Sequence, residues 1–154
     1  MSAIEKRRRN MVRHVCKQAW IYLKRTSIDS LSCAMRLAWM KIQSRLFSHY
    51  TKVRGVTFED RQRLLNRLSK YKENDIILTA ERVYDNPYDR YAIEIIATVQ
   101  GKGSGTLGYI SKALSQGLAV KMDEGAWLIP IIENITGGTA GRPFGLNFSY
   151  LIIE

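Results

Sequence analysis

The sequence has little of what metal centres, disulfide frameworks and histidine-based catalysis require. Its 154 residues include two cysteines, Cys16 and Cys33, and two histidines, His14 and His49. Two cysteines are too few for the multi-bridge framework of a small secreted domain, so we expect buried thiols in a reducing compartment. The spacing of the four residues matches no zinc module. We therefore predict neither a structural disulfide nor a metal site.

Long apolar runs are also missing. No stretch approaches the roughly 18 apolar residues that a membrane-spanning helix needs. The basic start, MSAIEKRRRNMVRH, is not followed by the apolar segment of a signal peptide. These absences predict a cytoplasmic protein with no membrane partner.

Acidic residues are scarce in the first third of the chain. Residues 1–54 contain 13 lysines and arginines and 2 acidic residues, a net charge of +11, whereas residues 55–154 sum to −1. The densest cluster is KRRR at positions 6–9. Such asymmetry is typical of an arm that meets a polyanion, either nucleic acid or an anionic membrane. The alternative is a basic helix that is merely solvated.

Helical periodicity dominates this basic third. Apolar residues recur at spacings of three and four, which predicts helices over about 4–24 and about 31–47. The link RTSIDS offers serine and aspartate caps for the second helix. Residues 1–50 thus form a predicted basic helical hairpin, in which Trp20 and Trp39 are expected to be packing residues. A lone hairpin buries little surface, so we expect it to dock on the rest of the chain or on a partner.

Short strands and helices alternate over residues 51–154, which form the second predicted domain. Strand-like alternation occurs at 52–58, 75–83, 91–99, 106–110, 127–135 and 145–153, and helical spacing occurs at 60–71 and 111–125. GKGSG at 101–105 is predicted to be a hairpin tip, because it lacks the spacing of a phosphate-binding loop. The pattern favours an α+β domain around a small barrel or curled sheet.

No catalytic constellation can be assembled from the sequence. Asp85 and Asp89 could serve as paired carboxylates, but no nucleophile or metal cluster accompanies them. A nuclease therefore has only scattered carboxylates in its favour. We predict a protein that is not an enzyme and needs no cofactor.

The stretch YDNPYD at 84–89 combines turn chemistry with residues that a turn does not need. Pro87 fixes its own φ and favours an extended Asn86, and the Asp85 and Asn86 side chains can bond to nearby backbone groups. These effects do not account for Tyr88 followed by Asp89. An aromatic ring beside a carboxylate is the part with functional content.

These residues resemble a known family. The matching positions are Glu81, Asn86-Pro87-Tyr88-Asp89, Ala92-Ile93, Leu107-Gly108-Tyr109-Ile110 and Leu114, and RGVTFEDRQ at 54–62 is similar to the family's opening segment. The order of these motifs resembles the HIRAN domain over about residues 53–154. The basic helical front would be an extension to it.

The resemblance implies an OB-like barrel that holds the 3′ end of single-stranded DNA. By that likeness Tyr88 would stack on a terminal base, Asp89 would accept a hydrogen bond from the 3′-OH, and Phe58 would be the opening aromatic. Lys112 would contact phosphate, with Tyr109 beside it, and Asn86 belongs to the same motif. Two departures matter, because Thr57 and Tyr109 stand where the DNA-binding member has cationic groups.

The leading hypothesis is therefore a non-enzymatic protein that recognises single-stranded DNA 3′-OH ends. Duplex DNA or RNA, bound through the basic helices, are further candidate partners. The alternative hypothesis is a protein-interaction adaptor of a mobile element or phage, whose basic helices dock on an acidic partner protein.

Overall fold

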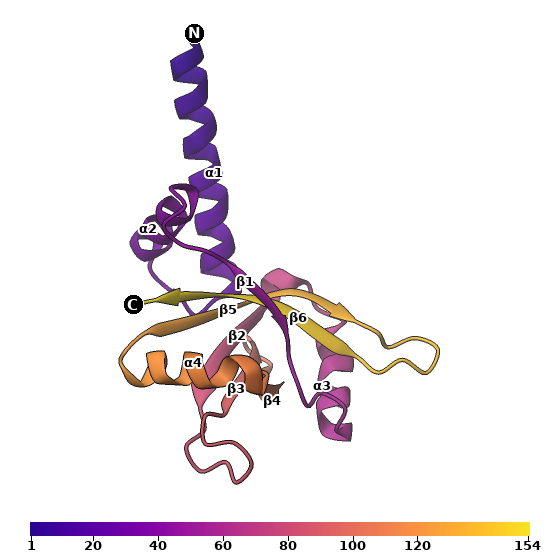
Figure 1. Cartoon of the computed structure of the whole chain (residues 1–154). Coiled ribbons are helices and arrows are strands. Elements are labelled where there is room, and N and C mark those ends of the chain that lie inside the picture. Colours follow the sequence, from indigo (N-terminus) through magenta and orange to yellow (C-terminus); the bar gives the residue numbers. More distant parts are fainter.

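The computed structural model describes residues 1–154, which form four α-helices, one 3-10 turn and six strands (Figure 1). In chain order the elements are α1 (Ala3–Arg25), α2 (Leu31–Ile42), β1 (His49–Lys52), α3 (Glu59–Leu68), η1 (Glu73–Asp75), β2 (Ile76–Arg82), β3 (Ile93–Val99), β4 (Gly103–Tyr109), α4 (Lys112–Asp123), β5 (Trp127–Thr136) and β6 (Gly145–Ile153). The expected α+β class is confirmed.

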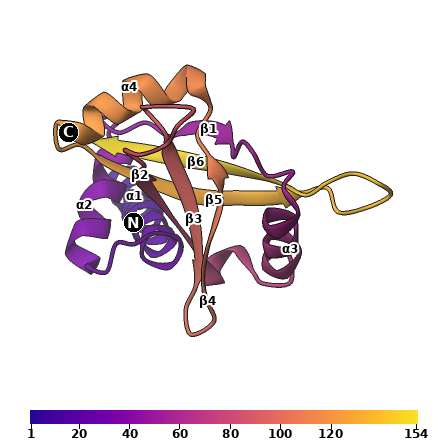
Figure 2. The same cartoon turned by 90° about the horizontal axis from the view of Figure 1, so that it is seen from below.

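The strands form two antiparallel sheets of three. One has the order β1-β6-β5 and the other the order β2-β3-β4. The sheets cross each other, as Figure 2 shows, and β2 contacts β5 without a ladder of hydrogen bonds. Because their edge strands pack and do not pair, the sheets do not close into the barrel that the sequence predicted.

The main core lies between the two sheets. Alternate residues of β3 are buried, namely Ile93, Ile95, Ala97 and Val99, as the period-two pattern predicted. α3 and α4 add further apolar side chains at the margins of this core, including Leu65 and Leu118. A hairpin tip joins β3 and β4 as predicted, but it consists of residues 100–102, because Gly103, Ser104 and Gly105 of the predicted tip already pair with β3 as the start of β4.

A second core lies on the other face of the β1-β6-β5 sheet, against the helical hairpin. Ile129 and Ile131 of β5 and Leu151 of β6 pack there with residues of α1 and α2. Leu128 and Ile132 of β5 belong to the main core instead. β5 is therefore buried on both faces, which explains why its sequence is a continuous apolar run and not an alternating one. The hairpin docks on the rest of the chain, and the predicted domain boundary at residue 50 falls within β1.

Two predicted boundaries near residue 50 are wrong. The second helix ends at Ile42 and not at Phe47, because Ser44 has a φ of 57°, which no right-handed helix accommodates. That turn carries Leu46 back into the second core. The next strand is His49–Lys52 and not 52–58, so most of the opening segment is a loop.

Only the C-terminal half of α1 packs against the body, although the apolar spacing continues into the N-terminal half. Contact with the body begins at Val15, so Met11 and Val12 are exposed. Trp20 is 57% exposed, and Trp39 is exposed as well, so neither is the packing residue that we predicted. Tyr22, for which the sequence analysis made no prediction, is fully buried. None of the helices combines the length and apolar character that crossing a membrane requires.

Candidate functional site

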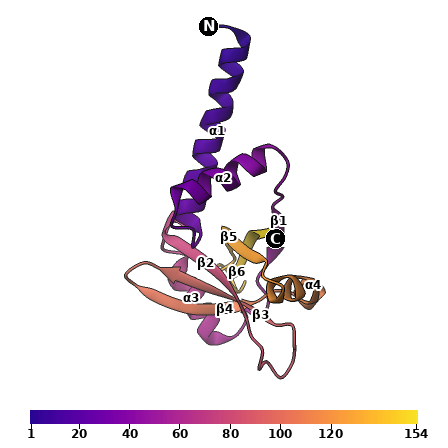
Figure 3. The same cartoon turned by 90° about the vertical axis from the view of Figure 1, so that its left-hand side faces the viewer.

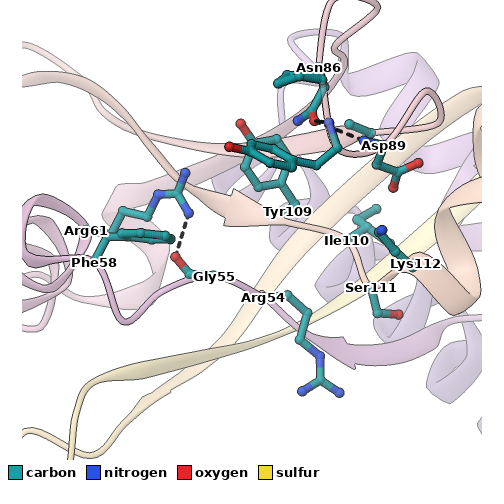
Figure 4. A pocket seen from close by; sticks show the side chains of 13 residues that line it. Arg54, Gly55, Phe58, Arg61, Asn86, Asp89, Tyr109, Ile110, Ser111 and Lys112 are labelled. Atoms are coloured by element: carbon teal, nitrogen blue, oxygen red, sulfur yellow. Dashed lines mark hydrogen bonds between the residues drawn. The ribbon is translucent and has the colours of Figure 1, made fainter.

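One open pocket, of about 650 Å³, gathers the residues that the sequence singled out. Three segments build it: the loop before α3 with the first turn of that helix, the loop between β2 and β3, and the link from β4 to α4 (Figure 4). Its lining consists of Arg54, Gly55, Phe58, Arg61, Asn86, Pro87, Tyr88, Asp89, Ala92, Tyr109, Ile110, Ser111 and Lys112. The structure thus brings together all six predicted site residues from three separate segments.

The loop from Val83 to Ala92 is held by its own polar side chains. Asn86 Oδ1 accepts hydrogen bonds from the backbone N–H groups of Tyr88 (2.9 Å) and Asp89 (3.1 Å). The Val83 N–H donates to the Ala92 carbonyl at 3.0 Å and closes the loop. Asn86 therefore shapes the pocket wall through turn chemistry, as YDNPYD predicted for that residue. Asp85 is exposed and does not line the pocket.

Asp89 is half-buried and already has two donors. Its Oδ1 accepts from the Tyr91 N–H at 2.9 Å, and its Oδ2 accepts from the Ser115 hydroxyl at 3.2 Å. An ionised carboxylate offers about four lone-pair positions, so further donors can still reach it. Asp89 thus both caps its turn and presents acceptor capacity to the pocket.

An ionic network supports this loop from behind. The Arg82 side chain, 8% exposed, contacts Asp123 of α4 at 3.0 Å and donates to the Ala92 carbonyl at 2.8 Å. The Tyr84 hydroxyl donates to Asp123 at 2.9 Å. Hydrogen bonds from Arg82 and Tyr84 lower the pKa of Asp123, and the hydrogen bond to Asp123 raises the pKa of Tyr84. The network ties the loop to α4 and so fixes one wall of the pocket.

Two aromatic rings of the pocket face solvent. Tyr88 is 85% exposed and Phe58 is 65% exposed, although each ring could bury a large apolar area. They come from different loops and line the same cavity. Exposed rings that converge on one cavity are typical of a binding surface and not of a packed core.

Cations line the pocket at positions that the sequence analysis missed. Arg61 Cζ lies 5.0 Å from the ring centroid of Phe58 and 5.2 Å from that of Tyr109, and Arg61 Nη1 donates to the Gly55 carbonyl at 2.5 Å. Arg54 also lines the cavity, and its guanidinium points away from Phe58 and Tyr109 (Figure 4). Both arginines lie within the segment 54–62 that resembles the family's opening segment, so their closeness to Phe58 was the available signal. Thr57 and Tyr109 carry no positive charge themselves, but Arg54 and Arg61 supply positive charge close to them.

Asp89, Ser111 and Lys112 group on one side of the cavity, and Phe58 and Arg61 lie on the other with Tyr109 between (Figure 4). Ser111 precedes α4 and its hydroxyl makes no capping hydrogen bond, so it is free to meet a ligand. The first residues of α4 therefore face the cavity, and a helix N-terminus favours negative charge.

The histidines and cysteines do not converge on this pocket. His49 stacks on Tyr150, with ring centroids 5.2 Å apart, and His14 lies on the projecting half of α1. No group of three or more histidine, cysteine or acidic side chains is placed to hold a metal ion.

Comparisons with known proteins do not identify a family for this chain. No family model and no curated protein matches the chain. A solved structure of a protein from Lactobacillus plantarum, determined by a structural genomics consortium, is similar over 70% of this chain and 99% of that chain. The sequence identity is 20% and the TM-score is 0.48. The function is therefore inferred from the pocket itself.

Proposed function

We propose that this protein is a non-enzymatic, HIRAN-like binder of the 3′-OH ends of single-stranded DNA. The observation that carries the proposal is that the six residues selected by the resemblance to the family all line one open pocket. These residues are Phe58, Asn86, Tyr88, Asp89, Tyr109 and Lys112. In this proposal the two crossed sheets correspond to an opened form of the family's OB-like barrel.

The exposed rings of Tyr88 and Phe58 are suited to the terminal bases. Stacking of a base on an aromatic side chain contributes about 1–3 kcal/mol and tolerates any sequence, because every base has a π face. The rings project from different segments into one cavity, so they can contact the same or adjacent bases.

Asp89 supplies the preference for a strand end. A carboxylate repels phosphate and is a poor contact for the interior of a strand, but it accepts a hydrogen bond from a terminal hydroxyl. Its bonds from Tyr91 and Ser115 fix its orientation before any ligand arrives. It would therefore disfavour a 3′-phosphate at the position where it accepts a 3′-OH.

Arg54, Arg61 and Lys112 supply the attraction for the phosphates that precede the end. Arg61 is held between two rings and by the Gly55 carbonyl, so little side-chain freedom is lost when it binds. The pocket thus combines stacking, hydroxyl recognition and backbone contact within one cavity.

The test compares oligonucleotides that differ only at their ends. Fluorescence anisotropy should show tighter binding of a 3′-OH strand than of a 3′-phosphate strand, and weaker binding of a single-stranded circle. Asp89→Asn should reduce that preference, because it removes the charge that repels the terminal phosphate while keeping an acceptor oxygen for Tyr91. Equal affinity of the wild-type protein for both linear strands would exclude the proposed end recognition.

A matched pair of variants separates stacking from general surface effects. Tyr88→Ala should weaken binding by about 1–3 kcal/mol. Tyr50→Ala removes an aromatic ring of similar exposure (73%) that lies outside the pocket, and it should leave binding unchanged. The proposal fails if both variants bind like the wild-type protein.

A further inference from the structure

The N-terminal half of α1 is a projecting arm. Residues 1–14 are all exposed, and α1 extends away from both sheets (Figure 1). Its start is closed by a capping box in which Ser2 Oγ accepts from the Glu5 N–H at 3.2 Å and the Ser2 N–H donates to Glu5 Oε2 at 2.7 Å. From Val15 onward the helix is anchored in the second core. The arm is therefore a preformed helix that has no packing partner within the chain.

One face of α1 carries a row of cations. Lys6, Arg9, Arg13, Lys17 and Lys24 follow one another at spacings of three, four, four and seven residues, which places them in one stripe. The stripe lies opposite the packed residues Val15, Ala19 and Tyr22, and all five cations are exposed. At a rise of 1.5 Å per residue it is about 27 Å long.

Nothing within the protein neutralises this cationic stripe. The ion pairs of the structure join Arg63 to Glu59 and Asp60, Arg82 to Asp123, and Lys121 to Glu154, and none of them involves α1. The single acidic residue of α1, Glu5, is occupied in the capping box. Five like charges held in a row without counter-charges favour a polyanionic partner.

We propose that the cationic stripe of α1 binds the phosphate backbone of double-stranded DNA without sequence preference. A straight helix suits a stiff duplex: measured along the duplex axis, each strand carries one phosphate per about 3.4 Å, so the length of the stripe corresponds to about eight base-pair steps. The major groove of B-form DNA admits an α-helix, whereas that of an RNA duplex is deep and narrow.

A membrane surface fits the arm less well. Membrane-surface helices present a broad apolar face with aromatic or leucine side chains opposite the basic one. The exposed apolar residues of the arm are Ile4, Met11 and Val12, and Arg8 lies among them on the same side. Trp20 is exposed on the cationic side of the helix and not on the apolar one.

The stripe and the pocket are separate sites. The free end of α1 and the loop Val83–Ala92 lie at opposite ends of the molecule in two perpendicular views (Figures 1 and 3). The free end of the stripe is therefore distant from the terminal nucleotides that the pocket would hold, and it is available to a different segment of nucleic acid. The protein would bridge a duplex and a strand end.

Covalently closed circular duplex DNA tests the stripe alone, because it has no strand end for the pocket. The full-length triple variant Arg9→Gln, Arg13→Gln, Lys17→Gln should bind the circle at least about tenfold more weakly than the wild-type protein at 0.1 M salt. Loss of three phosphate contacts, at about 0.9 per contact, should reduce the slope of log K against log salt by about 2.7. Thermal unfolding of the variant should match the wild-type protein, since the three side chains face solvent.

A second triple variant controls for net charge. Arg67→Gln, Lys70→Gln and Arg142→Gln remove three exposed cations from outside α1 and the pocket, and should have a much smaller effect. Tyr88→Ala should bind the circle normally. Failure of the wild-type protein to bind the circle, or equal losses in the two triple variants, would overturn the proposal. So would binding to phosphatidylserine vesicles that the α1 variant loses while its DNA binding persists.

Discussion

Arg54 and Tyr109 exchange two backbone hydrogen bonds, of 2.8 and 2.9 Å, which hold the opening segment against the end of β4 at the pocket. The pairing depends on Gly108. A Cβ at that position would lie 2.1 Å from the Arg54 carbonyl oxygen and 2.7 Å from a methyl carbon of Val53. The pocket therefore depends on a residue that has no side chain.

Gly108→Ala should destabilise the protein and weaken single-strand binding, because the opening segment must move away from β4. The backbone clash is with a fixed carbonyl, so we expect a loss of at least about 2 kcal/mol in the free energy of unfolding. Gly117→Ala in α4 is the matched control, since a Cβ at that position would have no neighbouring atom within 4 Å. That change should stabilise the helix by about 0.5–1 kcal/mol. Urea unfolding of both variants checks the contrast.

Arg61→Gln should weaken binding of single-stranded DNA and reduce the salt dependence. Arg61 is held between Phe58 and Tyr109, so its charge faces the cavity. Loss of one phosphate contact should reduce the slope of log K against log salt by about 0.7 for a single strand. Arg63→Gln removes the same charge from the same helix, where it pairs with Glu59 outside the pocket, and should leave the slope nearly unchanged. Identical slopes for the two variants would contradict the role of Arg61.

Acid should break the ionic network that ties the loop carrying Tyr88 to α4. Arg82 and then Tyr84 lower the pKa of Asp123 below its ordinary 3.8, so the network is intact above that pH and is lost as the pH falls through the lowered value. Asp123→Asn should reduce thermal stability at pH 7. The difference in Tm between the wild-type protein and this variant should shrink below about pH 3.8. A difference that stays constant from pH 7 to pH 3 would show that the ion pair adds nothing.

Tyr22→Phe should stabilise the protein. The Tyr22 hydroxyl is buried without a hydrogen-bond partner; the side chain of Gln18 partly lowers its pKa but lies outside hydrogen-bonding geometry. Removing this hydroxyl should raise the free energy of unfolding by about 1 kcal/mol.

The advantage of this variant should grow in alkali. Burial raises the pKa of Tyr22 from 10.0 to about 12, so the stability that depends on its neutral form is complete below pH 10 and is lost as the pH rises through 12. Urea unfolding from pH 7 to pH 11 measures this divergence. At pH 7 Tyr71→Phe, which removes a hydroxyl at an exposed position, serves as the control and should leave the free energy of unfolding nearly unchanged.

Helices and strands that bury a single face were predictable, because the buried face sets the spacing of their apolar residues. The alternation in β3 and the apolar spacing of α4 are set by a single buried side, and both elements lie where the sequence placed them. The end of α2 was not predictable, because the residue that takes the left-handed conformation there is Ser44, and a serine gives no indication of that conformation as a glycine would. The absence of a closed barrel depends on how two sheets cross, which no local pattern encodes.

The candidate site was predictable to the extent that single motifs carried it. Three motifs identified the three segments that line the pocket. They are NPYD at 86–89, GYI at 108–110 and the opening segment at 54–62. Arg54 and Arg61 were missed because their roles depend on the pairing of Arg54 with Tyr109 and on the first turn of α3, both of which are tertiary features. The charges along the sequence place the excess of cations in residues 1–54, so they gave no indication that Arg54 and Arg61 would line the pocket.

The burial of β5 on both faces makes the main core and the packing of the helical hairpin depend on the same strand. Cleaving the chain near residue 50 would uncover Ile129, Ile131 and Leu151 and would remove part of β1, so the remainder would lose the support on which its sheets depend. Shortening the chain only as far as His14 removes exposed residues alone. Removal of the arm alone should therefore cost the fold little, whereas removal of the rest of α1 would expose the second core that covers β5.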